Sequence, residues 1–170
     1  MHQHSSPFII DIEASGFGNG SYPIEIGVAL NAGNRFCTLI TPEPHWTYWD
    51  DEAEKVHHVS REMLQQHGKS VQDVTRQLND LLNGMILYSD GWVVDQPWLI
   101  QLFAAAGNNI EFHVSPLEII LCEAQMAIWH TTKDQVIEQS QLSRHRASND
   151  AWIIQETFRQ TYARIKHTRG

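Results

Sequence analysis

The chain has 170 residues, of which 42% are hydrophobic, and its formal net charge at pH 7 is −8. This length suits a single domain with an apolar core, and no apolar run approaches the ~20 residues that a membrane span requires. The negative charge argues against binding along duplex nucleic acid, because phosphate contacts need lysine and arginine. The first residues carry neither the basic region nor the apolar core of a secretory signal, so we expect a cytoplasmic protein with one domain, residues 1–170.

The first predicted element is an apolar strand over residues 7–14 that carries two acids, Asp11 and Glu13. Alternate side chains of a strand share a face, so we expect the two carboxylates on one face, about 7 Å apart. Apolar residues fill the opposite face: Phe8, Ile10 and Ile12. At ~5 Å and an effective dielectric of about 20, two carboxylates repel by about 3 kcal/mol. A divalent cation between them would offset this repulsion; the alternative is an exposed strand face with two solvated acids.

Two further strands are expected over residues 23–31 and 34–41, joined by a hairpin at 31–34, where the sequence is Asn-Ala-Gly-Asn. A short helix is expected to begin at Ser60. Apolar residues at helical spacing predict another helix over 70–82, capped by Ser70.

The second half of the chain alternates strands with helices. The expected elements are strands over 85–88 and 111–114, a helix over 97–106, a helical region over 117–140 broken near His130, and a last helix over 147–165. Three antiparallel strands followed by this alternation predict an α/β sandwich with a mixed five-stranded sheet flanked by helices. The strand that carries Asp11 would lie at the centre of the sheet.

Two more acids and a histidine fall at element boundaries. Asp95 follows the fourth strand near a helix start, and Asp150 lies in the first turn of the last helix. A carboxylate at either place can simply stabilise the helix N-terminus, which is the alternative to a role in a site. His145 lies on the approach to the last helix, where a lone histidine is usually a surface residue.

Residues 141–170 are basic, with six lysines and arginines against two acids. A basic segment on an acidic body suits a short anionic ligand. The alternative is a helix with a solvated basic face.

The four acids and His145 are all expected on one side of the sheet. Four carboxylates supply oxygen ligands for two Mg²⁺ or Mn²⁺ ions. Two such ions about 4 Å apart can activate water and stabilise the leaving oxygen in phosphodiester hydrolysis. A histidine, whose pKa lies near neutrality, suits the general base.

Four segments carry a resemblance to a known family: Asp11–Phe17, Pro23–Val28, Val56–Ser60 and His145–Ala151. They resemble the DEDDh 3′→5′ exonucleases, which implies a ribonuclease H-like three-layer sandwich. The first and last segments match that family's first and third motifs. The segment at 56–60 is similar to its His-Gly-Ile segment, with His58 where glycine is usual. The resemblance covers residues 8–160.

The middle motif departs from the family pattern, which has His-Asn a few residues before its aspartate. Here the stretch from Tyr88 to Asp95 reads Tyr-Ser-Asp-Gly-Trp-Val-Val-Asp. Spacing and the helix start select Asp95, and Asp90, which falls where the histidine is usual, stays as the alternative.

The resemblance implies a role for each site residue. Asp11 would bridge both metal ions, Glu13 and Asp150 would hold the ion that activates water, and Asp95 would act on the second ion. His145 would be the general base.

The resemblance also implies substrate contacts. Phe17 would stack on the terminal base, although it could equally be a core residue under a loop. Ser15 and Gly16 would hold the terminal sugar hydroxyl, and His58 and Trp92 are weaker contact candidates.

We therefore expect a 3′→5′ exonuclease, dependent on two Mg²⁺ or Mn²⁺ ions, that degrades single-stranded nucleic acid to nucleoside 5′-monophosphates, with RNA or short oligonucleotides favoured. One alternative is a DNA proofreading or repair exonuclease. The other is a non-catalytic nucleic-acid or protein adaptor with the same fold. A homodimer is compatible with the resemblance, and no membrane contact is expected.

Overall fold

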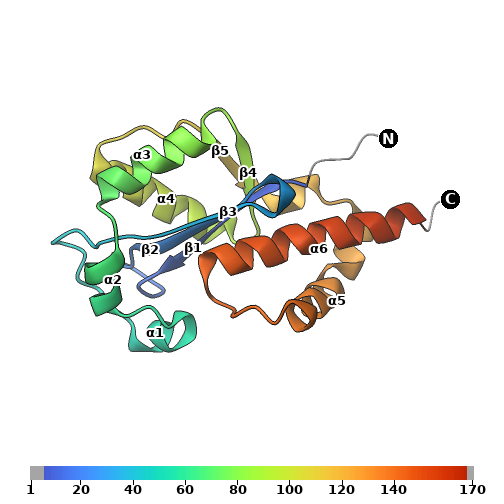
Figure 1. The fold of residues 1–170 in the computed structure, drawn as a ribbon, viewed down its shortest axis with the longest axis horizontal. Helices are drawn as coiled ribbons and strands as arrows, with labels where there is room; N and C mark the ends of the chain where they lie inside the picture. Colours follow the sequence, from blue (N-terminus) through green and yellow to red (C-terminus); the bar gives the residue numbers. More distant parts are fainter. Residues whose placement is uncertain (1–5, 168–170) are drawn as a thin grey trace.

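The computed structural model describes residues 6–167 as a five-stranded sheet between helices (Figure 1). In chain order the elements are β1 (Phe8–Ala14), β2 (Pro23–Ala29), η1 (Asn31–Gly33), β3 (Arg35–Leu39), α1 (Asp51–His57), α2 (Arg61–His67), α3 (Val71–Leu82), β4 (Ile86–Ser89), α4 (Trp92–Ala106), β5 (His113–Pro116), η2 (Leu117–Ile120), α5 (Glu123–Ser140) and α6 (Ala147–His167). None of the helices within the described residues is both long and apolar enough to span a bilayer.

The strand order is β3-β2-β1-β4-β5, so β1 lies at the centre as predicted. β1 pairs antiparallel with β2 and parallel with β4, and β5 extends the sheet in parallel beyond β4. The mixed α/β sheet predicted from the sequence is therefore confirmed. β1 runs further than its pairing with β4, which involves only Phe8 and Ile9, and this leaves its carboxyl-terminal half open on that side.

The two faces of the sheet bury different side chains of β1. Ile10 and Ile12 face the main core, which α3 and α4 cover with residues such as Leu78 and Leu99. Ile9 faces the opposite side and packs in a second cluster with residues of α5 and α6. Figure 1 shows these layers, with α6 along one face and α5 outside it. Asp11 and Glu13, which alternate with the core residues, thus lie on the α6 face.

Local signals in the sequence explain several boundaries. The hydroxyl of Ser60 accepts a hydrogen bond from the Met63 amide, and that of Ser70 accepts one from the Asp73 amide, so both predicted caps are present. The predicted hairpin is confirmed: Leu30 donates to the Asn34 carbonyl across the η1 turn.

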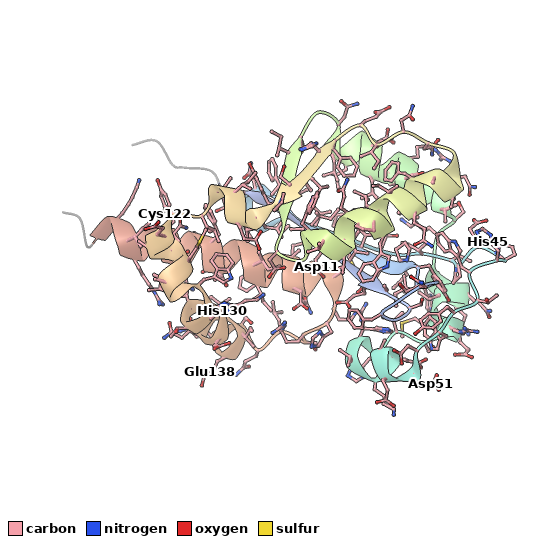
Figure 2. The ribbon with its side chains drawn as sticks, turned by 180° about the vertical axis from the view of Figure 1, so that it is seen from behind. Asp11, His45, Asp51, Cys122, His130 and Glu138 are labelled. Carbon is pink, nitrogen blue, oxygen red and sulfur yellow. The ribbon has the colours of Figure 1, made fainter. Side chains whose placement is uncertain are left out.

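The structure differs from the prediction at several element boundaries, and it contains one helix that was not predicted. α4 begins at Trp92, five residues before the expected start, because Pro97 lies close enough to the N-terminus that only one helical hydrogen bond is lost. α5 runs unbroken past His130, which lies on the outer surface with Glu138 (Figure 2). The sequence gave no clear signal for α1, which begins at an aspartate cap, Asp50, and carries three acids in its first turn.

Candidate active site

The floor of the site is built from paired positions on β1 and β2. In the antiparallel register, Asp11 lies opposite Gly27 and Glu13 opposite Glu25, all on the face that α6 covers. Gly27 is required there: a Cβ at this position would lie 2.1 Å from the backbone of Ala147, the first residue of α6. The missing side chain lets the N-terminus of α6 rest directly on the sheet beside Asp11.

Asp150, in the first turn of α6, is thereby brought to the β1 acids. Its carboxylate accepts hydrogen bonds from the His145 amide at 2.9 Å and from Nε of Arg144 at 2.7 Å. His145 has a φ of 59°, a left-handed conformation that is uncommon for a side chain other than glycine. The bond from its amide to Asp150 holds this conformation. Ligand atoms of Glu13, His145 and Asp150 lie within 4.8 Å of one another.

Asp95 reaches the same place from the opposite wall. It lies in the first turn of α4 and is buried, and its carboxylate accepts a hydrogen bond from the Ser89 hydroxyl at the end of β4. The open edge of β1 contributes as well, since a backbone hydrogen bond from Ile12 lowers the pKa of Asp95. The helix cap is Gly91, so Asp95 is not the N-cap residue, but it lies in the first turn of α4, where a carboxylate also stabilises the helix N-terminus.

The electrostatics show how closely these carboxylates converge. Burial, then repulsion from Asp95, Glu13 and Asp150, raises the pKa of Asp11 well above its ordinary value. Burial and repulsion from Asp150 raise the pKa of Glu13 to about 7. Burial also raises the pKa of Asp95 to about 7. The charge cluster expected from the sequence is therefore present in the fold, and it is strongly unfavourable without a counter-charge.

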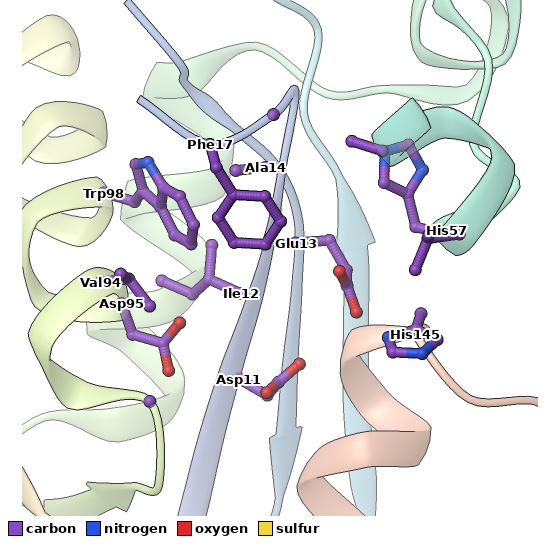
Figure 3. Close-up of a pocket in the computed structure, with 14 residues that line it drawn as sticks. Asp11, Ile12, Glu13, Ala14, Phe17, His57, Val94, Asp95, Trp98 and His145 are labelled. Atoms are coloured by element: carbon purple, nitrogen blue, oxygen red, sulfur yellow. The ribbon is translucent and has the colours of Figure 1, made fainter. Parts of the chain in front are cut away.

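A cleft of about 330 Å³ opens above these acids (Figure 3). Asp11, Glu13 and Asp95 lie in its floor, and His145 lies at its edge. Phe17 is 75% exposed, and its ring lies 6.5 Å from that of Trp98, measured between centroids. The walls are mainly apolar, and none of the described residues that line the cleft is a lysine or an arginine.

The loop after β1 positions Phe17. A Cβ on Gly16 would lie 2.6 Å from Cβ of Asp50 and 2.8 Å from the ring of Tyr48, so only glycine lets the loop pack so closely. Tyr48 also donates its hydroxyl to the Phe17 carbonyl. Gly16 and Phe17 line the cleft, as predicted from the sequence.

His57 lines the cleft, and the predicted His58 does not. His57 is 2% exposed; its Nδ1 accepts a hydrogen bond from the Val59 amide at 3.1 Å, and its Nε2 has no partner. The neutral ring therefore carries its proton on Nε2, and burial lowers the pKa of this imidazole. His58 ends α1 with a φ of 57° and lies in a separate hollow among the acids of α1. Left-handed backbone explains why glycine is usual at this position and corrects the choice of His58.

Two other predicted contacts are engaged elsewhere. The Ser15 hydroxyl is fully buried and accepts a hydrogen bond from the Tyr22 amide, so it faces the protein instead of the cleft. Trp92 packs against the main core and donates its Nε1 to the Val114 carbonyl. Asp90, the alternative to Asp95, forms an ion pair with Lys133 of α5 at 2.7 Å.

Sequence reasoning missed the ion pair that anchors α6. Glu25 is fully buried, and its carboxylate accepts hydrogen bonds from Arg146 at 2.6 Å and from the Ala147 amide at 3.0 Å. A signal was present, because an acid alternates with apolar residues on β2 just as Asp11 does on β1. Trp98 was also missed, and no local pattern distinguishes it from a core tryptophan.

The donor set fits divalent cations. Hard ions such as Mg²⁺ and Mn²⁺ prefer carboxylate oxygens. Asp11, Glu13 and Asp95 offer these in the cleft, and Asp150 offers them beside Glu13. Burial and repulsion between carboxylates raise the pKa values of Asp11, Glu13 and Asp95, so a cation bound among these acids would stabilise their charged forms.

No family model matches this sequence. No curated protein matches it either.

Solved structures of exonucleases share the fold at low sequence identity. The zinc-bound E. coli Exonuclease I complex with single-stranded DNA aligns with a TM-score of 0.69 and 10% identity over 91% of this chain and 40% of that chain. The E. coli enzyme with a dA16 oligonucleotide gives a TM-score of 0.65 and 9% identity over 91% and 40%. Exonuclease I from Methylocaldum szegediense gives a TM-score of 0.56 and 8% identity over 72% and 29%. The chain spans less than half the length of these proteins, and it has the ribonuclease H-like fold that they contain.

Proposed function

We propose that this protein is a metal-dependent 3′→5′ exonuclease that hydrolyses single-stranded nucleic acid to nucleoside 5′-monophosphates. The observation that carries the proposal is the convergence of Asp11, Glu13 and Asp95 at one cleft, with Asp150 and His145 within 4.8 Å of Glu13. Asp11, Glu13 and Asp95 form no ion pair with a lysine or arginine within residues 6–167, so grouping them is costly to fold, and a site for divalent ions gives that cost a purpose.

The geometry suggests how the acids divide their work. Asp11 lies between the others and would contact both ions, while Glu13 and Asp150 would hold the ion nearer His145. Asp95 would hold the second ion from the α4 side. When bound, such ions polarise the phosphodiester and make water a better nucleophile.

His145 is placed to act as the general base. Its ring is exposed at the cleft edge and lies within 4.8 Å of the Glu13 and Asp150 oxygens. A neutral imidazole there can accept the proton from an attacking water. The bond from its amide to Asp150 couples its position to that of a metal ligand.

The walls of the cleft support a single-stranded end as substrate. Phe17 and Trp98 offer aromatic surface for an unpaired base, and stacking of this kind is worth about 1–3 kcal/mol whatever the base. The absence of lysine and arginine from the described lining disfavours a duplex grip.

RNA or short oligonucleotides are the first candidate substrates, because the described lining of the cleft has no lysine or arginine with which to hold a duplex. Single-stranded DNA is the second candidate, because the neighbours of similar fold include Exonuclease I complexes with dA16 and other deoxyoligonucleotides. A DNA repair role would follow from the second candidate. An adaptor without activity is disfavoured, because it would have no use for the acid cluster.

The test is cleavage of matched, 5′-labelled RNA and DNA oligomers with Mg²⁺ or Mn²⁺. We expect Asp11→Asn to abolish cleavage and His145→Ala to lower turnover by about 10²–10⁴ while leaving metal binding intact. Asp134→Asn, an exposed change on α5, is the matched control and should cleave like the unaltered protein. Equal cleavage by all four proteins, or none by the unaltered protein with either metal, would rule the proposal out.

A further inference from the structure

Lys133 of α5 reaches the end of β4, at the edge of the cleft. Its Nζ lies 2.7 Å from Oδ2 of Asp90, which directly follows β4 and precedes Gly91, a residue of the cleft lining. Burial raises the pKa values of Asp11 and Asp95 most, and repulsion from Asp90 raises both further. The Asp90 carboxylate is therefore close to the acid cluster, and it holds the Lys133 ammonium at the same edge of the cleft.

The ion pair uses only part of the hydrogen-bonding capacity of Lys133. An ammonium has three N–H donors, and within residues 6–167 Lys133 uses one of them, in the bond to Asp90. Both side chains are partly exposed, at 22% for Lys133 and 27% for Asp90. The ammonium can thus keep its bond to Asp90 and donate another to a phosphate oxygen at this edge.

The division of the acids in the proposed function implies a direction for the bound strand. In an in-line displacement, the attacking water and the leaving oxygen lie on opposite sides of the scissile phosphorus. The water lies on the Glu13–Asp150 side, so the leaving oxygen, which belongs to the upstream nucleotide, lies toward Asp95. The next phosphate upstream is therefore on the Asp95 side, at the edge that Lys133 reaches.

The rest of the cleft suits the bases of such a strand. Phe17, Val94 and Trp98 line it without carrying a charge. Figure 3 shows the rings of Phe17 and Trp98 together at one end of the cleft and Asp11 at the other. A single strand has phosphates along one side and bases along the other, which matches a cleft with a cation at one edge and an apolar wall.

We propose that Lys133 binds the phosphate immediately upstream of the scissile one, so that the protein prefers chains of three or more nucleotides to dinucleotides. The inference rests on the proposed function for the direction of the strand. The alternative is a structural lysine that only holds α5 against the end of β4. A structural lysine affects every substrate alike, whereas a phosphate contact affects only substrates that contain the upstream phosphate.

The first measurement is kcat/KM for oligomers of two and of three nucleotides with a 5′ hydroxyl. The dinucleotide contains only the scissile phosphate, and the trinucleotide adds the upstream one. We expect Lys133→Gln to lower kcat/KM by ~10-fold for the trinucleotide, because a hydrogen bond to a charged group is lost, and by less than ~2-fold for the dinucleotide. Lys133→Arg keeps the charge and should restore most of the loss.

Two further variants separate the contact from the ion pair. Lys133→Gln leaves Asp90 without its cation, so Asp90→Asn combined with Lys133→Gln removes both charges and should show the same difference between the two substrates. Arg76→Gln, which breaks an exposed ion pair on α3, is the matched control and should change neither rate. Equal losses for the dinucleotide and the trinucleotide in both Lys133 variants with glutamine would overturn the inference.

The second measurement is binding without hydrolysis, by fluorescence anisotropy of a 5′-labelled single-stranded decamer with Ca²⁺ in place of Mg²⁺. One phosphate contact on a single strand contributes about 0.7 to the slope of log K against log salt between about 50 and 200 mM. Lys133→Gln should reduce the slope by this amount, and Lys133→Arg should not. An unchanged slope, or no binding by the unaltered protein, would overturn the inference. If the slope falls as expected but no oligomer is cleaved with Mg²⁺ or Mn²⁺, the Lys133 contact stands and the exonuclease proposal fails.

Discussion

Two groups of buried carboxylates lie only one strand apart and differ in their partners. Glu25 on β2 is fully buried but has Arg146 at 2.6 Å and the Ala147 amide at 3.0 Å. Asp11 on β1 faces other acids, and its pKa is raised well above the ordinary value by burial and by Asp95. Within residues 6–167, Glu25 has a partner cation and Asp11 forms no ion pair with a lysine or arginine.

This difference distinguishes acids with a structural role from acids that could bind a ligand or take part in a reaction. A buried acid with its own cation fixes geometry: Glu25 holds the start of α6, and with it His145, over the sheet. A buried acid without a cation destabilises the fold, and such groups persist where they bind or react. Three experiments test whether the two groups behave as differently as their surroundings suggest.

The largest expected effect on stability follows from breaking the compensated pair. Arg146→Met leaves Glu25 buried without its cation and should lower the free energy of unfolding by about 3 kcal/mol, the lower end for buried pairs because the arginine is one-third exposed. Urea denaturation measures the change. Arg159→Met, which breaks the exposed pair with Glu156, should cost less than about 1 kcal/mol. Equal losses in the two variants would mean that Glu25 does not depend on Arg146.

For Asp11, which has other acids as neighbours, we expect a substitution to raise the stability of the protein instead of lowering it. With metal removed by a chelator, Asp11→Asn should stabilise the protein at pH 8 by on the order of 2 kcal/mol, because it relieves repulsion within the cluster. The same change should abolish cleavage. If the variant is more stable but inactive, the charge of Asp11 is needed for function and not for stability.

The pH dependence follows from the raised pKa values. Glu13 and Asp95 have pKa values of about 7 in the folded protein, against ordinary values of 4.5 and 3.8. Folding therefore favours their protonated forms, and this stabilisation is complete below about pH 4 and is lost as the pH rises through 7. His57, whose pKa burial lowers, acts in the opposite direction in both proteins and cancels in the comparison. The unaltered protein should lose more stability than Asp11→Asn between pH 5 and 8, and equal slopes would contradict the assignment.

Much of the fold could be predicted because its signals are local. The alternation in β1, the hairpin at η1 and the caps of α2 and α3 each depend on a few neighbouring residues. The start of α4 could not be read in the same way, because Pro97 suggests a helix start but is tolerated one turn further in. Tertiary packing decided that boundary.

In the candidate site, too, the residues with local sequence signals could be predicted and those that depend on tertiary contacts could not. The four acids, His145, Gly16 and Phe17 could be proposed from the sequence because each lies in a motif or at a recognisable element boundary. Which way a side chain points is harder to predict, so Ser15 and His58 were chosen where the cleft uses neighbouring positions. The partners of Glu25 and Asp150 are not local, since Glu25 and Arg146 lie 121 positions apart in the chain.

The smallest expected effect decides between Asp90 and Asp95. Asp90 has a cation, Lys133 at 2.7 Å, and both side chains are roughly three-quarters buried, with exposures of 27% and 22%. Asp95 has the Ser89 hydroxyl and, within residues 6–167, no ion pair with a lysine or arginine, and burial raises its pKa. By this comparison, Asp90 has a structural role and Asp95 belongs to the proposed metal site. We expect Asp90→Asn to lower stability by about 1 kcal/mol and to change turnover less than ~3-fold.

Asp95→Asn is the matched change on the other side of this comparison. It should leave stability without metal unchanged or raised, weaken Mn²⁺ binding, and lower turnover by at least ~10² because a metal ligand is lost. The readouts are Mn²⁺ titration and initial rates on a labelled oligomer. If Asp90→Asn proves the more damaging change for Mn²⁺ affinity, then the ion pair with Lys133 opens during catalysis, and a salt bridge in the resting protein is no guide to which acids bind metal. If Asp95→Asn alone loses affinity, the presence or absence of a protein cation distinguishes the two acids correctly, five residues apart in the chain.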